Sequence, residues 1–175
     1  MSNQNKEIMK ITPDDTSLAL RLKQFMQQKN ATISTAESCT CGRIGATITC
    51  IDGSSTYYQG GIMAYQNWIK EQYLGVTPQM IEEHDVVSQE VVLQMAVACR
   101  RLFGTHYAIA TTGYTGDGNE RVLSGTIYIG FASPTATKAV KLSLPHSTRE
   151  ERTAAAAQTA ISQFLEWISA FNPAF

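Results

Sequence analysis

The chain of 175 residues contains 43% hydrophobic residues and has a formal net charge of −1, which is typical of one soluble globular domain with a sizeable core. Lysine and arginine are scattered and balanced by acidic residues, so we expect neither a nucleic-acid partner nor a membrane partner. The N-terminal segment lacks the apolar stretch of a signal peptide, and no later segment is apolar enough to span a bilayer. The sequence therefore predicts a cytoplasmic, single-domain protein, 1–175, that begins with a flexible segment over 1–12.

The cysteines indicate neither a metal site nor a disulfide framework. Cys39, Cys41, Cys50 and Cys99 form no CxxC pair and no set with histidine spacing. We therefore expect no bound metal, and we interpret Cys50 and Cys99 as small buried apolar residues.

Helical and extended patterns alternate along the chain, with no linker or internal repeat between them. In chain order, the expected elements are a helix from about 14 to 29, a strand over 31–35, a helix over 42–51, a strand over 57–65, a helix over 66–74, a helix over 88–104, strands over 107–112, 126–132 and 137–144, and a final helix opened by a capping-box pattern at 148–151. Helices on both faces of a mixed β-sheet give a three-layer α/β/α sandwich, which is the α/β fold that we expect.

The segment 34–42, STAESCTCG, is the most informative part of the chain. It follows an apolar approach and ends in glycine, which is typical of a strand that turns into a helix and presents polar side chains and free N–H groups at the turn. Glu37, Ser38, Cys39, Thr40 and Gly42 would then line a crevice. A Ser/Thr-rich helix cap without a catalytic duty is the alternative interpretation of these residues.

Four loops are candidates for the edge of the sheet where ligands bind in such folds. They are the turn at 38–42, the loop at 52–55, the corner at 65–67 with Lys70 one turn into its helix, and the loop at 112–119. The last loop contains three of the twelve glycines, which suits close approach of the backbone to a phosphate or a sugar. Tight turns also require such residues, so turn formation alone is the alternative explanation for each loop.

Five sequence blocks, in this order and spacing, resemble the CinA C-terminal domain family. The blocks are TAESCTCG at 35–42, GSSTYYQGGIMAYQNWIKEQYLGV at 53–76, VVSQEVVLQMA at 86–96, TTGYTGDG at 111–118 and SGTIYIGF at 124–131. That family includes the stand-alone nicotinamide-nucleotide amidases, and the resemblance covers nearly the whole chain from the first helix onward. It implies hydrolysis of nicotinamide mononucleotide to nicotinate mononucleotide and ammonia, with no cofactor and with a homodimer as the expected assembly.

The chain departs from the family pattern on the ligand side. Cys41 stands where the family usually has the first glycine of SCTGG, and the glycine loop reads TGYTGDGNERVLSGT in place of the longer TGIAGPGGG followed by KPVGT. Arg149 is the best counterpart of the arginine in the family's GDR motif before the last helix. These departures affect the recognition of phosphate more than the chemistry itself.

The resemblance implies a Ser-Lys mechanism, with Ser38 as the nucleophile and Lys70 as its base. A lysine can accept the proton only when neutral, which requires desolvation or a nearby cation. Tyr65 and Ser55 match positions that relay the proton or hold the dyad, and the N–H groups that open the helix after Cys39 would form the oxyanion hole. Cys39 is the rival nucleophile, although none of the three histidines lies in a matched block.

The substrate-binding residues that we expect are Glu37, Thr40, Gly42, Asn67, Thr112, Gly113 and Arg149. Without the resemblance, Lys70 would be an ordinary exposed lysine and Arg149 a helix-start residue. A second hypothesis is a catalytically silent relative that retains the fold and pocket and acts as a nucleotide-binding or regulatory module.

Overall fold

A five-stranded mixed β-sheet forms the centre of the structure, a computed structural model that describes residues 11–170. The strand order is β2-β1-β3-β4-β5, in which β2, β1 and β3 are mutually parallel, β4 is antiparallel to β3, and β5 is antiparallel to β4. The strands are β1 (Ile33–Glu37), β2 (Tyr58–Met63), β3 (Tyr107–Gly113), β4 (Thr126–Ala132) and β5 (Thr137–Ser143).

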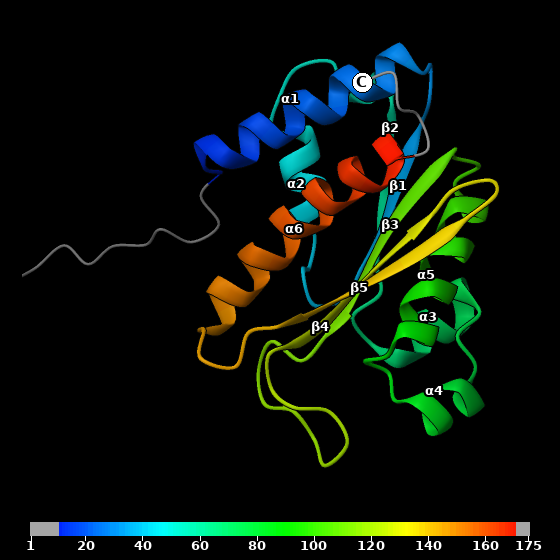
Figure 1. Ribbon diagram of the computed structural model, residues 1–175. Helices are drawn as coiled ribbons and strands as arrows, with labels where there is room; N and C mark the ends of the chain where they lie inside the picture. Colours follow the sequence, from blue (N-terminus) through cyan, green and yellow to red (C-terminus); the bar gives the residue numbers. More distant parts are fainter. Residues whose placement is uncertain (1–10, 171–175) are drawn as a thin grey trace, which may run out of the picture.

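Helices cover both faces of this sheet, so the expected three-layer α/β/α sandwich is confirmed (Figure 1). One layer consists of α1 (Pro13–Gln28), α2 (Arg43–Thr49) and α6 (Arg149–Ala170). The other layer consists of α3 (Asn67–Leu74), α4 (Pro78–His84) and α5 (Gln89–Leu102), and a short 3₁₀ helix spans Ser54–Thr56. The sequence did not predict α4, a helix of seven residues that has no fully buried residue and packs on the core through the partly buried Met80 and Ile81.

Two apolar clusters hold the layers together. Between the sheet and the helices α1, α2 and α6, the rings of Phe131, Phe164 and Trp167 pack with centroids 5.7–6.2 Å apart. On the opposite face, small residues allow α5 to lie close to the sheet. A Cβ atom added at Gly130 would stand 2.6 Å from the carbonyl oxygen of Val92. The absence of a side chain at Gly130 therefore sets the close packing of α5 on β4.

The register of the strands gathers several loops at one edge of the sheet. Glu37, the last residue of β1, pairs with Met63 of β2 and with Thr111 of β3. Gly113 at the end of β3 pairs with Ile127 near the start of β4. The segments 38–42, 64–66, 114–125 and 144–148 therefore all leave the sheet at this carboxyl edge of β1, β2 and β3.

The boundary of β1 differs from the prediction by two residues. The expected strand 31–35 begins too early, because the Ala31 N–H still donates to the Met26 carbonyl at 2.9 Å and completes the end of α1. Asn30, with φ of 47°, makes the turn out of that helix. The strand therefore begins at Ile33 and carries its buried face up to Glu37, next to the turn at 38–42.

Two smaller expectations are only partly met. Of the segment 1–12 that was expected to be flexible, residues 1–10 lie outside the described residues, whereas Thr12 forms a capping box with Asp15 at the start of α1. Cys99 is fully buried as predicted, but Cys50, at the C-cap of α2, is only partly buried. Within residues 11–170, no helix combines the length and the apolar character that crossing a membrane requires.

Candidate active site

Ser38 lies at the first position beyond β1, in the turn that leads into α2. Its N–H donates to the Thr111 carbonyl at 3.1 Å, which continues the pairing of β1 with β3 by one residue. Cys41 and Gly42 then reverse the chain with φ angles of 50° and 90°, a conformation that glycine adopts easily and cysteine rarely. The strand and this turn fix the backbone of Ser38, which is 7% exposed.

A buried carboxylate holds the turn together. The Glu37 side chain accepts hydrogen bonds from the Thr40 hydroxyl at 2.7 Å and from the N–H groups of Gly42, Ile44 and Gly45 at 2.9–3.0 Å. The negative charge lies at the N-terminus of α2, where the helix dipole favours it. Glu37, Thr40 and Gly42 therefore organise the turn and do not line the cavity beside Ser38, contrary to their expected role in substrate binding.

Lys70 lies in the first turn of α3 and is 2% exposed. Its ammonium donates to the Tyr65 carbonyl at 3.1 Å, and no carboxylate of residues 11–170 pairs with it. Burial lowers the pKa of Lys70 from 10.5 to about 8, and the neighbouring Cys39 opposes this shift only in part. Lys70 is therefore not an ordinary exposed lysine, and a substantial fraction of it is neutral near physiological pH.

Cys39 has the character of a buried neighbour. Burial raises the pKa of its thiol to about 12, and a Cβ atom added at Gly113 would lie 3.1 Å from its sulfur. A thiol with this pKa carries almost no thiolate at neutral pH, and the thiolate is the reactive form. This environment disfavours Cys39 as the nucleophile.

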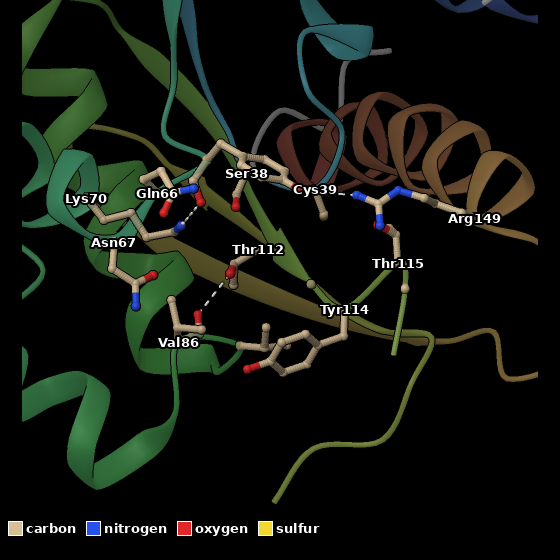
Figure 2. Close-up of a pocket in the computed structure, with 14 residues that line it drawn as sticks. Ser38, Cys39, Gln66, Asn67, Lys70, Val86, Thr112, Tyr114, Thr115 and Arg149 are labelled. Carbon is tan, nitrogen blue, oxygen red and sulfur yellow. Dashed lines mark hydrogen bonds between the residues drawn. The ribbon is translucent and has the colours of Figure 1, made fainter. Parts of the chain in front are cut away.

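One cavity of about 360 Å³ brings together Ser38, Lys70 and most of the predicted binding residues. In Figure 2 the side chains of Ser38 and Lys70 point into the same space, and Arg149 and Thr115 lie at the opposite end. The lining residues are Ser38, Cys39, Tyr65, Gln66, Asn67, Lys70, Val86, Val87, Thr112, Gly113, Tyr114, Thr115, Gly116 and Arg149. The cavity volume falls within the range of small-molecule sites.

Arg149 closes the end of the cavity away from Lys70. It is the first residue of α6, and its guanidinium donates to the Tyr65 hydroxyl at 3.0 Å. It also lies against the glycine loop, since a Cβ atom at Gly116 would be 3.0 Å from its Nη1. The Tyr65 hydroxyl thus contacts Arg149, and it makes no hydrogen bond with Ser38 or Lys70 in the described structure.

The remaining expected residues occupy three different settings. Asn67 lines the cavity with an exposed side chain, whereas the buried Thr112 hydroxyl donates to the Val86 carbonyl at 2.8 Å. Gly113 also lines the cavity, and a side chain at this position would collide with Ile127. Ser55 belongs to the 3₁₀ helix before β2, which lies at the end of the strands opposite the cavity. The length of that strand, about 20 Å, separates Ser55 from the cavity in the same chain, so it cannot hold the dyad there.

Sequence reasoning singled out only part of the cavity wall. Gln66, Tyr114 and Thr115 lie in loops that were candidates for ligand binding but were not named individually, and the apolar side chains of Val86 and Val87 gave no signal of a site. Arg152, the second arginine of α6, is buried behind the wall and binds the loops that form it. Its guanidinium donates to the carbonyls of Thr115, Gly116, Leu144 and Pro145 and to the Ser124 hydroxyl.

Comparison with other proteins places this site within a sequence family. A sequence model of the CinA C-terminal domain matches residues 15–168. The chain is 42% identical over 125 residues to a CinA-like protein from Flavobacterium psychrophilum and 39% identical over 121 residues to one from Rippkaea orientalis. These matches cover 69% and 68% of this chain but 29% of each relative. The chain thus spans less than a third of the length of these curated relatives.

Solved structures share the fold over almost the whole chain. The competence/damage inducible protein CihA from Agrobacterium tumefaciens is 27% identical, with a TM-score of 0.86 over 90% of this chain and 97% of that chain. A competence-damaged protein (CinA) superfamily protein from Escherichia coli is 24% identical, with a TM-score of 0.84 over 95% of this chain and 99% of that chain, and this likeness concerns the fold alone. The domain match and the sequence relatives together show that this chain belongs to the CinA C-terminal domain family.

Proposed function

We propose that this protein is an amidohydrolase that converts nicotinamide mononucleotide to nicotinate mononucleotide and ammonia, with Ser38 as nucleophile and Lys70 as base. The observation that carries the proposal is the buried Lys70 ammonium, which shares a cavity with Ser38, has no carboxylate partner among the described residues, and has a pKa of about 8. Family membership and an arginine at the far end of the cavity support the choice of a nucleotide substrate.

In the proposed reaction, neutral Lys70 removes the Ser38 hydroxyl proton while Oγ bonds to the carboxamide carbon. The carbonyl π electrons move to oxygen and form the tetrahedral oxyanion. Its collapse restores the C=O bond and breaks the C–N bond, and the Lys70 ammonium returns the proton to the leaving nitrogen, which departs as ammonia. Water then attacks the Ser38 ester in the same way, releasing the carboxylic acid product and regenerating the hydroxyl.

The hydrogen bonds of the turn limit which groups can stabilise the oxyanion. The helix N–H groups of Gly42, Ile44 and Gly45 already donate to Glu37, so the expected oxyanion hole at the start of α2 is occupied by the protein's own carboxylate. The N–H groups of Cys39 and Thr40 donate to no other residue within 11–170. We assign the oxyanion hole to these two groups, which directly follow the nucleophile in the chain.

Substrate binding must bring the two catalytic groups together. The Lys70 ammonium donates to the Tyr65 carbonyl and makes no hydrogen bond to Ser38 in the described structure. Catalytic hydrogen bonds are often long in ligand-free enzymes and shorten in the complex. A rotation of the Lys70 side chain from Tyr65 toward Ser38 is therefore part of the proposal. A catalytically silent nucleotide-binding module is the competing function, and it predicts binding without release of ammonia.

Ser38→Ala and Lys70→Met should each abolish hydrolysis. Loss of the nucleophile should lower kcat by on the order of a thousandfold or more, and loss of the base by about two to four orders of magnitude. The measurement is ammonia released from nicotinamide mononucleotide by each purified variant. Lys141→Met, which removes an exposed lysine of β5, is the matched control and should keep the parent rate.

Thermal unfolding of Lys70→Met separates catalysis from folding. Replacing a buried, unpaired ammonium by an apolar side chain should leave Tm unchanged or raise it.

Parent activity in either Ser38→Ala or Lys70→Met would remove the dyad from the mechanism. Failure of the unaltered protein to release ammonia while it binds the nucleotide would favour the silent module.

The activity should rise with pH through the ionisation of Lys70. Below a pKa of about 8 the neutral fraction of the base grows tenfold per pH unit, so kcat should increase with unit slope on a logarithmic plot and level off above pH 8. The measurement is the initial rate at saturating substrate in buffers from about pH 5.5 to about pH 9.5. A flat profile over that range would contradict a lysine base.

Arg149→Ala should weaken the use of the nucleotide more than the use of the phosphate-free riboside. A charge-assisted contact contributes about 1.5–3 kcal/mol, so kcat/KM for nicotinamide mononucleotide should fall roughly ten- to hundredfold. The change for nicotinamide riboside should stay within about threefold, since that compound has no charge for Arg149 to bind. Arg101→Ala, which removes an exposed arginine of α5, is the control. Equal losses with both compounds would mean that Arg149 binds no phosphate.

A further inference from the structure

The backbone of Asp85 adopts an unusual conformation. It follows α4 with φ of 73° and ψ of 151°, a region that glycine occupies readily and other residues rarely. It is also buried, with 6% of its surface exposed. A buried, charged residue in such a conformation persists only where its side chain makes contacts that hold it there.

The Asp85 carboxylate makes three such contacts, two of them with the loop that follows β3. Oδ1 accepts from the Val87 N–H at 2.8 Å and from the Tyr114 hydroxyl at 3.3 Å. Oδ2 accepts from the Asn119 side-chain amide at 2.8 Å, and the same amide donates to the Tyr114 hydroxyl at 2.9 Å. Asp85, Tyr114 and Asn119, which we call the Asp85 clamp, thus join two segments that are distant in sequence.

The loop side of the Asp85 clamp is itself well ordered by hydrogen bonds. The Asn119 side-chain oxygen accepts from the N–H groups of Arg121 and Val122 at 2.9 and 2.8 Å. Arg121 then donates to the carbonyls of Glu82 and Glu83 at 2.7 and 2.8 Å, at the end of α4. These contacts and the Asp85 clamp tie α4 to the rest of the protein, in addition to the packing of its partly buried Met80 and Ile81.

The same two segments form one wall of the candidate active site. Val86 and Val87 follow Asp85 directly and line the cavity, and Tyr114 lines it from the opposite segment. The Thr112 hydroxyl donates to the Val86 carbonyl at 2.8 Å, so the segment 85–87 is held by this hydrogen bond as well as by the Asp85 clamp. None of the clamp's hydrogen bonds involves Ser38 or Lys70.

We propose that Asp85 is a positioning residue that fixes the wall formed by Val86, Val87 and Tyr114 and thereby sets the fit of the substrate in the cavity. Its effect on substrate use rests on the function proposed above, whereas its effect on the wall does not. Because Asp85 acts on the wall and not on the reacting groups, loss of the clamp should raise KM and leave kcat nearly unchanged.

Two substitutions and a reciprocal exchange test this role. Asp85→Gly removes the carboxylate and relaxes the backbone at the same time, so the relief of strain offsets part of the stability lost with the hydrogen bonds. Asp85→Asn retains the shape but has a single acceptor oxygen, so in either orientation its NH2 group faces a donor, the Asn119 amide or the Val87 N–H. Asp85→Asn combined with Asn119→Asp restores a donor and an acceptor in exchanged positions. Asp117→Asn removes an exposed carboxylate of the same loop and is the control.

Hydrogen exchange of the amides in 114–122 and steady-state kinetics with nicotinamide mononucleotide are the two readouts. Asp85→Gly and Asp85→Asn should each accelerate exchange in this loop and raise KM about tenfold, with kcat within about twofold. The reciprocal exchange should recover most of both effects, and Asp117→Asn should change neither. Parent exchange rates in both single variants would overturn the proposal, as would a fall in kcat as large as the rise in KM.

The exchange measurement separates this proposal from the proposed function. If the parent protein releases no ammonia, the amidase assignment fails, and faster exchange in the two variants with recovery in the reciprocal pair still supports the positioning role of Asp85. If the parent hydrolyses the nucleotide and the variants exchange as the parent does, the amidase stands and the Asp85 clamp is overturned.

Discussion

The arrangement of the site depends on the buried Glu37 carboxylate at the end of β1. It binds the Thr40 hydroxyl and three N–H groups at the start of α2, and so ties the strand, the turn and the helix into one unit. Removing one of these partners would leave the buried carboxylate with an unsatisfied acceptor position, which is costly. Ser38, the next residue, is held between this unit and the Thr111 carbonyl of β3. The nucleophile therefore has a fixed backbone before any substrate binds.

The buried ammonium of Lys70, unlike the Glu37 carboxylate, destabilises the fold. Its pKa falls from 10.5 to about 8, and at about 1.4 kcal/mol per pKa unit this burial costs the fold on the order of 3 kcal/mol. The cost is fully present well below pH 8, where both the folded and the unfolded protein carry the proton, and it disappears as the pH rises through 8 toward 10.5. A structural lysine gains nothing from such a position, whereas a general base requires it. The destabilisation is thus the strongest physical argument for a catalytic role.

The sequence predicted the layers of the fold because most helices and strands bury a regular apolar face. The helix α4 escaped prediction because it has only seven residues and none of them is fully buried. In the site, the motif around Ser38 and the corner before Lys70 led to residues that share the cavity. Ser55 did not join them, since a loop motif does not reveal which edge of the sheet its loop occupies.

The polar residues of the turn were harder to interpret from sequence. Glu37 and Thr40 have the residue types of a ligand site, but the Glu37 side chain binds the start of α2 and the Thr40 hydroxyl donates to Glu37. Arg152 and Asp85 gave no signal because their contacts join segments far apart in the chain. The expected homodimer and the absence of nucleic-acid and membrane partners stay predictions.

The titration of Lys70 tests the central claim most directly. Lysines labelled with ¹³C at Cε can be followed by NMR as the pH is raised, with Lys70→Met identifying the signal of Lys70. The account predicts a midpoint near pH 8, well below the other lysines. A midpoint near the ordinary lysine value of 10.5 would contradict it, because an ammonium that stays charged cannot accept the Ser38 proton.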